Sequence, residues 1–107
     1  MASAYKNVVT LVGSTGDVTI YTCPAATEAI IKNINLYNES SFVTIVIYPK
    51  ITDSSASVTA TLKKISLATV TDTSLTGPFV LEASDTLLLN CDVASKIYAV
   101  ASVLELS

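Results

Sequence analysis

The sequence predicts an all-β protein, a single antiparallel β-sandwich or jelly roll of about eight strands that spans residues 1–107. Three observations support this fold class. The chain is rich in Thr, Ser and Val and poor in residues that favour helices, such as Glu, Gln and Met. Apolar and polar residues alternate along several segments, whereas no segment sustains a helical spacing. The length of 107 residues suits one domain with one hydrophobic core.

The strands are expected where short alternating segments lie between turns. In residues 57–63, Val58 and Ala60 alternate with Ser and Thr, which is the period of a half-buried strand. The intervening residues, such as 13–16 and 52–55, are Gly, Ser, Thr and Asp, which suit turns. To within about two to four residues, the expected strands are 4–12, 17–22, 28–38, 42–49, 57–63, 66–71, 79–83, 86–92 and 96–105.

The first segment has a second interpretation. Residues 1–12 are terminal and have an extended pattern, so they form either an N-terminal strand or an arm that reaches a neighbouring subunit. Their sequence lacks a charged stretch that leads into an apolar one, so we expect no signal peptide and folding in a cytoplasm. A membrane partner is not expected either, because no run of about 20 uninterrupted apolar residues is present.

The third segment breaks the alternation. Ile34 belongs to the inward set, but Ile31 lies only three residues before it. Either Ile30 is the inward residue and Lys32 intrudes on the core face, or one extra residue forms a β-bulge near Lys32-Asn33. We favour the bulge, because a single extra residue restores the inward set.

Two segments, 42–48 and 97–104, are apolar on both faces. A sandwich strand needs only one apolar face, so the second face must be covered by loops of the same chain or by a neighbouring subunit. We favour a subunit, because large exposed apolar patches usually mark interfaces and a short chain has little material to spare. The expected interface residues are Phe42, Val46, Tyr48, Ile97, Ala99, Ala101 and Val103.

The composition argues against catalysis. The chain has no His, Trp or Arg, and its six basic residues are all lysines, so the commonest general base is missing. Its one Ser-x-x-Lys, Ser3 to Lys6, lies at the terminus, where a catalytic helical pair is not expected. Most acids lie in or beside turns, and Glu82 and Asp85 flank a predicted hairpin. We therefore predict no enzyme activity and no cofactor.

Metal and phosphate sites are also not expected. Two cysteines, Cys23 and Cys91, are too few for a disulfide scaffold, and a zinc site would lack histidine ligands. The simplest interpretation is two buried, reduced thiols, although a disulfide between them stays open. Residues 53–55 and 72–74 lack the density of oxygen ligands that calcium needs. The two glycines of residues 13–16 indicate a turn, because no Gly-Lys-Ser/Thr follows.

Charge and aromatic residues bear on possible ligands. The net charge is −3 and Lys63-Lys64 is the one basic doublet, so direct binding of nucleic acid is disfavoured. Tyrosines can line a sugar-binding surface or cover core edges and interfaces, and we favour the second role. The tyrosines concerned are Tyr21, Tyr37, Tyr48 and Tyr98.

Three stretches resemble small β-sandwich virion proteins of tailed bacteriophages. The longest is residues 18–38, in which a strand ends in Tyr21-Thr22-Cys23-Pro24-Ala25 and a second strand ends in Asn38 before a Ser-rich turn. The opening Tyr5-Lys6-Asn7-Val8-Val9 and the later Leu81-Glu82-Ala83-Ser84-Asp85-Thr86-Leu87 are similar to the same group. The resemblance touches most of the chain and consists of the order of its strands and turns.

The resemblance implies a structural, non-catalytic role in a virion made in the host cytoplasm, often as a homotrimer. A capsid decoration or cement protein is the first choice, because the chain is one compact domain without a fibrous segment. Its implied partners are further copies of itself and the major capsid protein or another virion protein. The alternative is a tail, neck or fibre component that binds host glycans through Tyr and Asn. A cupin-like enzyme is disfavoured, because cupins usually hold their metal through His.

Overall fold

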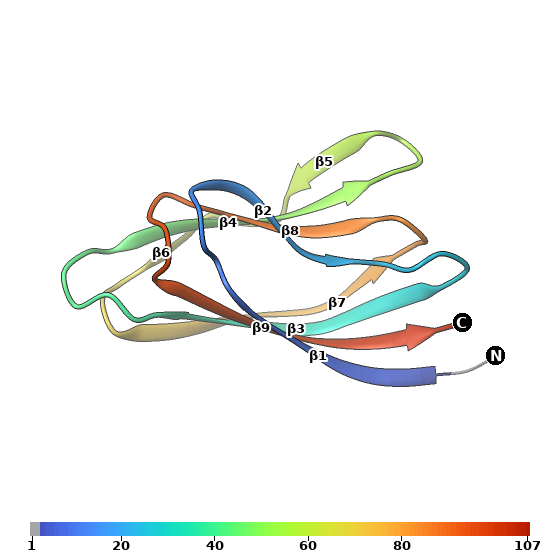
Figure 1. Cartoon of the computed structure of the whole chain (residues 1–107), viewed down its shortest axis with the longest axis horizontal. Helices are drawn as coiled ribbons and strands as arrows, with labels where there is room; N and C mark the ends of the chain where they lie inside the picture. Colours follow the sequence, from blue (N-terminus) through green and yellow to red (C-terminus); the bar gives the residue numbers. More distant parts are fainter. Residues whose placement is uncertain (1–2) are drawn as a thin grey trace.

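The computed structural model describes residues 3–107 and confirms the predicted fold class, because these residues form two antiparallel sheets and no helix (Figure 1). The first sheet has the strand order β1-β9-β3-β7 and is called the β9 sheet below. The second has the order β2-β8-β4-β5, with β6 also paired to β4, and is called the β8 sheet. The strands are β1 (Ser3–Leu11), β2 (Gly16–Thr22), β3 (Glu28–Asn38), β4 (Ile45–Asp53), β5 (Val58–Thr61), β6 (Ile65–Leu67), β7 (Thr71–Leu81), β8 (Thr86–Cys91) and β9 (Ile97–Leu106).

The chain passes back and forth between the two sheets, so each sheet collects strands from both halves of the sequence. This is the connectivity of a jelly roll, a double-sheet fold that closes one core between two antiparallel layers. In Figure 1 the β9 sheet forms the lower layer and the β8 sheet the upper one. Both described ends of the chain therefore belong to the β9 sheet, at its two neighbouring strands β1 and β9.

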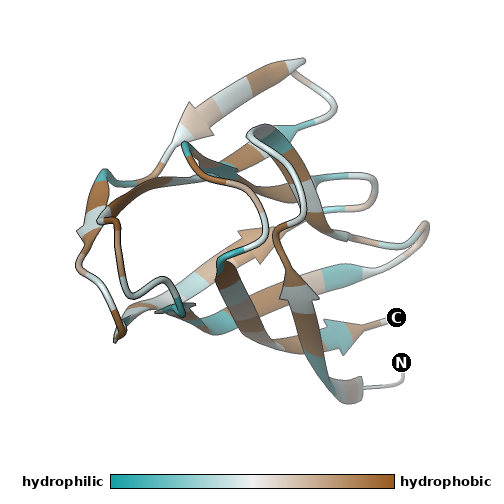
Figure 2. Ribbon diagram, turned by 60° about the vertical axis from the view of Figure 1, so that its left-hand side comes forward, coloured by the Kyte–Doolittle hydropathy of each residue, from teal (hydrophilic) through white to brown (hydrophobic). Residues whose placement is uncertain are grey.

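Alternating apolar residues from both sheets fill the space between the layers, and Figure 2 shows the corresponding bands of hydropathy along the strands. Burying one such aliphatic side chain contributes about 1.5–3 kcal/mol to folding. The largest fully buried side chains of the core are Ile31, Ile34, Leu36, Ile45, Ile47, Leu81, Leu87, Leu89, Ile97, Val12 and Val103.

The first strand belongs to the chain's own sheet. Residues 3–11 pair with β9 along their full length, from Ser3 opposite Leu106 to Leu11 opposite Tyr98. The predicted strand or arm at residues 1–12 thus corresponds to β1, and residues 1 and 2 lie outside the described part of the chain. Extended backbone is present here, but its hydrogen-bonding partner is β9 of the same chain.

The predicted bulge is confirmed. The pairing of β3 shifts between Ile31 and Asn33 against both of its neighbours, β7 and β9. Ile31 and Ile34 consequently both lie in the core, although they are only three residues apart. Lys32 is the extra residue relative to β9, and its exposed side chain stays on the outside of the sheet.

Candidate functional site

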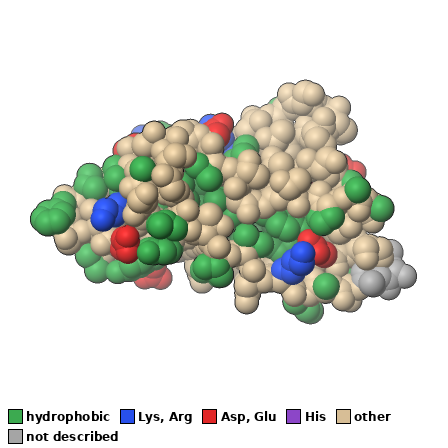
Figure 3. All heavy atoms as spheres, in the orientation of Figure 1, with side chains coloured by type: hydrophobic (Ala, Val, Ile, Leu, Met, Phe, Trp, Pro, Cys, Tyr) green, Lys and Arg blue, Asp and Glu red, His purple; other side chains and the backbone are tan. Residues whose placement is uncertain are grey.

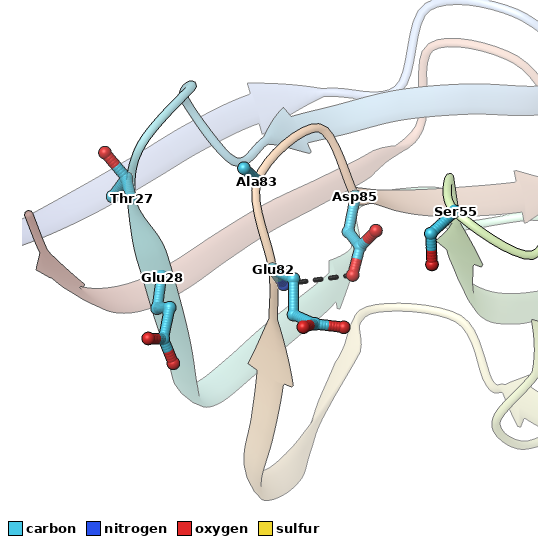
Figure 4. A pocket seen from close by; sticks show the side chains of 6 residues that line it. All are labelled: Thr27, Glu28, Ser55, Glu82, Ala83 and Asp85. Carbon is cyan, nitrogen blue, oxygen red and sulfur yellow. Dashed lines mark hydrogen bonds between the residues drawn. The ribbon is translucent and has the colours of Figure 1, made fainter.

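A hollow of about 350 Å³ lies beside the turn between β7 and β8, where Asp85 is one of its lining residues (Figure 4). One oxygen of the Asp85 carboxylate accepts hydrogen bonds from the Ser54 amide at 3.0 Å and the Ser54 hydroxyl at 3.2 Å. The other oxygen accepts from the Glu82 amide at 2.9 Å. The Ser54 amide, more than any other group, holds the pKa of Asp85 below its usual value. The carboxylate therefore ties two turns together, and it lacks the raised pKa of a general acid.

The remaining catalytic candidates do not converge. Among residues 3–107, no group of His, Cys, Asp and Glu side chains is arranged to hold a metal ion. Ser3 and Lys6 lie on the extended strand β1, so side chains three residues apart point to opposite faces of the sheet. Over the same residues, no helix has the length and hydrophobicity that crossing a membrane requires.

Both cysteines are buried and free, so the structure contains no disulfide between Cys23 and Cys91. Burial raises the pKa of the Cys91 thiol to about 11 and also raises the pKa of Cys23. The Cys23 thiol donates weak hydrogen bonds to the carbonyl oxygens of Thr27 at 3.3 Å and Leu81 at 3.7 Å. Only the thiolate acts as a nucleophile or a metal ligand, and a raised pKa disfavours that form. Both side chains are therefore structural.

A polar cluster between the two sheets was not predicted from the sequence. The Tyr21 hydroxyl, on the β8 sheet, donates a hydrogen bond to the Glu105 carboxylate on the β9 sheet. The Lys6 ammonium lies 3.2 Å from the same carboxylate. The Tyr21 hydroxyl and, less strongly, Lys6 hold the pKa of Glu105 below its usual value. Burial and Glu105 raise the pKa of Tyr21, so this cluster fastens the sheets and offers no reactive group.

The expected interface on β9 is wrong for four residues. Ile97, Ala99, Ala101 and Val103 are almost completely buried, because this phase of β9 faces the core of the same chain. The outer phase of β9 instead carries Tyr98, Val100, Ser102 and Leu104. A side chain that is enclosed by the chain's own two sheets is not available to a partner.

The other three expected interface residues lie nearer the surface. Phe42 belongs to the loop between β3 and β4 and is 95% exposed. Val46 and Tyr48 lie on the outer face of β4 and are half-buried, whereas Ile45 and Ile47 point into the core. The β4 strand starts three residues later than Phe42, so that side chain projects from a loop and not from the sheet.

The outer surface of the β9 sheet, called the β9 face below, is apolar over much of its area. Tyr5 is 76% exposed and Val9 is 70% exposed, although both lie within a strand. In Figure 3, hydrophobic atoms reach the surface along the lower margin, where the β9 sheet lies. Row by row across β1, β9, β3 and β7, the face consists of Tyr5, Leu104, Ile30 and Val80; Asn7, Ser102, Asn33 and Thr76; Val9, Val100, Asn35 and Ser74; and Leu11, Tyr98, Tyr37 and Asp72.

The outer surface of the β8 sheet is more polar. Lys50 and Asp17 form an ion pair at 3.0 Å, and Asn90 donates to Asp17 at 2.8 Å. The hydroxyls of Thr52 and Thr59 share a hydrogen bond at 2.7 Å. Such charged and hydroxyl side chains suit a face that stays in contact with water, which makes the β9 face the stronger candidate for an interaction surface.

Comparisons with known proteins find likeness in fold only. No family model and no curated protein matches the chain. A chain of the T13 IBDV viral particle matches 96% of this chain, with a TM-score of 0.60 and 9% identity. A protein of Bacillus endospore appendages, a family of disulfide-linked pili, matches 98% of this chain, with a TM-score of 0.58 and 13% identity.

The two neighbours differ in the share of their own length that this chain covers. This chain spans 30% of the viral-particle chain, so it corresponds to one part of a larger protein. It spans 88% of the appendage protein, which is therefore a domain of similar size. At such low identity the likeness describes the arrangement of strands and leaves function to be inferred from the surface.

Proposed function

We propose that this protein is a non-enzymatic structural subunit of a virion, and specifically a decoration or cement protein that stabilises the head through subunit contacts. The observation that carries the proposal is the contrast between interior and surface. Asp85, Glu105 and both cysteines are engaged within the fold, whereas the β9 face exposes apolar side chains. Large exposed apolar patches usually mark sites of contact with other proteins.

The comparisons support an assembly role. One neighbour comes from a viral particle, and the other, of nearly the same size, comes from appendages that are disulfide-linked pili. A small jelly roll therefore serves elsewhere as an assembling unit. Cys23 and Cys91 are both buried here, so assembly of this chain is proposed to be non-covalent and to persist in a reducing agent.

The proposed partners are further copies of this chain and the major capsid protein or another virion protein. Phe42, Val46 and Tyr48 stay candidates for the contact with the particle, because Phe42 projects from its loop and the other two lie on the outer face of β4. The homotrimer implied by the resemblance requires a contact between two different surfaces of each copy. The mass of the purified protein in solution reports how many copies the oligomer contains.

The proposal is tested by adding purified protein to heads that lack it. We expect saturable binding, a matching density on the head in a cryo-EM map and increased resistance of the heads to heat. Phe42→Ala should weaken binding while leaving the melting temperature unchanged, because Phe42 is 95% exposed. The control is Val58→Ala, which removes an apolar side chain from β5 that is 56% exposed and should leave binding intact.

A tail, neck or fibre component that binds host glycans is the alternative. The exposed neighbours Tyr37 and Tyr98, with Asn35 on the next row, provide rings and an amide that suit a sugar. Binding to a glycan array or to host cells, together with no binding to heads, would favour this role over decoration. Absence of both kinds of binding would contradict the virion proposal as a whole.

A further inference from the structure

We propose that the β9 face is a homodimer interface, in which two copies pack face to face with their strands antiparallel and Lys32 of one copy lies beside Asp72 of the other. The inference goes beyond the virion role and does not depend on it, because it concerns the purified chain alone. It also names a surface that differs from the interface residues expected on β9 and β4. Three features of the face lead to it: its size, its pattern of rows and the positions of its charges.

The size of the face approaches one side of a specific interface. Four strands at a spacing of about 4.8 Å, each about nine residues long at 3.3 Å per residue, give a flat footprint of about 570 Å². Side-chain relief increases the accessible area above that figure. A standard interface buries about 800 Å² on each partner, whereas most crystal contacts bury less than half of that. The face is thus large enough for a stable pair of copies.

The first and fourth rows of the face are complementary on three of the four strands when one copy is turned so that its strands run in the opposite direction. This rotation places each strand over its own counterpart and exchanges the first row with the fourth. Tyr5 then faces Leu11, and Leu104 faces Tyr98. On β3, Ile30 faces Tyr37. Each of these three pairs joins an aliphatic side chain to a tyrosine ring, which suits the amphipathic edge of an interface. On β7 the same rotation places Val80 opposite Asp72, and the middle rows bring polar side chains opposite valines on β1 and β9.

The charges of the face favour the same orientation. Lys32 and Asp72 lie about 16 Å apart in one chain, because Asp72 pairs with Tyr37, which lies five positions after Lys32. Within residues 3–107 neither side chain forms an ion pair, and the Lys32 ammonium lies 5.9 Å from the centre of the Tyr5 ring. The rotation places Lys32 of one copy over the end of β3 of the other copy, and Asp72 lies beside that end. By symmetry the dimer contains two such pairs of opposite charges.

The alternative rotation, about an axis along the strands, places each row over itself. Asp72 would then face Leu11 of the other copy, and Lys32 would face the middle of β9. Neither charge would then have a counter-charge from the other copy, whereas in the antiparallel arrangement Asp72, although opposite Val80, has Lys32 of the other copy beside it. The charges therefore select the antiparallel one.

The test measures the mass of the full chain by analytical ultracentrifugation over a range of concentrations. We expect a dimer at micromolar concentration. Val9→Asp should dissociate it, because this variant places one carboxylate from each copy within the buried β9 face, on its edge strand β1. The matched control is Val58→Asp on β5, an exposed valine outside the β9 face, which should leave the dimer intact. A thermal melt shows that each variant is folded.

Charge reversal tests the orientation. Lys32→Asp and Asp72→Lys should each weaken the dimer by about tenfold or more, because every substitution acts twice in a symmetric pair. The double variant should recover most of this loss. A monomer, a trimer, or a dimer that is insensitive to Val9→Asp would overturn the inference. Loss of head binding in Val9→Asp, with a monomeric parent, would assign the face to a different virion protein and equally overturn it.

Discussion

Replacing Asn38 by alanine should destabilise the fold and loosen the loop that presents Phe42. Asn38 is completely buried at the end of β3. Its side-chain amide donates to the carbonyl oxygens of Val43 and Leu67 at 3.0 Å and of Ala68 at 3.2 Å. One asparagine thus fixes two segments, residues 39–44 and 67–70, on the same end of the sandwich.

The expected cost follows from the groups that would lose their partners. The side-chain oxygen of Asn38 accepts a hydrogen bond from the Ser40 backbone amide at 2.9 Å. The Ser40 hydroxyl in turn accepts hydrogen bonds from the backbone amides of Phe42 and Val43. A buried polar group left without a partner costs about 1–3 kcal/mol, and water can reach the partly buried carbonyls. We therefore expect Asn38→Ala to lower the free energy of unfolding by about 2–4 kcal/mol, a large share of the 5–15 kcal/mol typical of a domain.

Urea unfolding monitored by tyrosine fluorescence measures this loss. The control is Asn90→Ala, the same truncation at a residue whose amide donates one exposed hydrogen bond, to Asp17. That variant should lose less than about 1 kcal/mol. If Asn38→Ala were no less stable than Asn90→Ala, the buried network would not be what fixes the loops. Proteolysis within residues 39–44 of the folded Asn38→Ala variant should also be faster.

Two further predictions concern the inter-sheet cluster and a close backbone approach. The folded-state pKa of Glu105 lies below its usual value near 4.5, so its contribution to stability is present above about pH 4.5 and is lost as the pH falls through the folded pKa. Glu105→Gln should therefore flatten the acid side of a stability–pH curve, and a curve unchanged from the parent would contradict the role of the Tyr21 hydrogen bond. Gly77→Ala should cost about 3 kcal/mol in urea unfolding, because a β-carbon would collide with the Ile31 carbonyl oxygen. Gly13→Ala, which has open space, should change little, and equal effects of the two would refute this explanation.

Most strand positions could be predicted from the sequence because alternation and turn residues agree there. Two of the exceptions involve proline. The β4 strand runs on through Pro49, where the expected strand ends, and β7 runs through Pro78, just before the expected strand 79–83 begins. Pro49 lies between the segments of β4 that pair with β6 and with β5, so its missing amide hydrogen falls in a gap. Pro78 lies on an edge strand, where a missing donor is tolerated.

The surface was harder to predict than the strands. The bulge beside Lys32 could be found because an extra residue leaves a visible break in the period of two. The cluster around Tyr21 could not, since it joins residues 84 positions apart in the sequence. Glu105 nevertheless shares the inward phase of Val103, and an acid on that phase is a signal that a partner must lie inside the sandwich.

The phase of β9 shows why alternation alone could not locate the interaction surface. Both phases are apolar, so hydrophobicity does not decide which one faces inward. The neighbouring strands decide it: Ala101 lies between Val8 and Ile34 in the sheet, and its small side chain leaves room for these larger ones in the core. Small residues thus complete the interior, while Tyr98 and the other outer side chains of β9 contribute little to that core. The apolar content of the β9 face is therefore in excess of what one copy needs to fold, and a second copy is the simplest way to bury it.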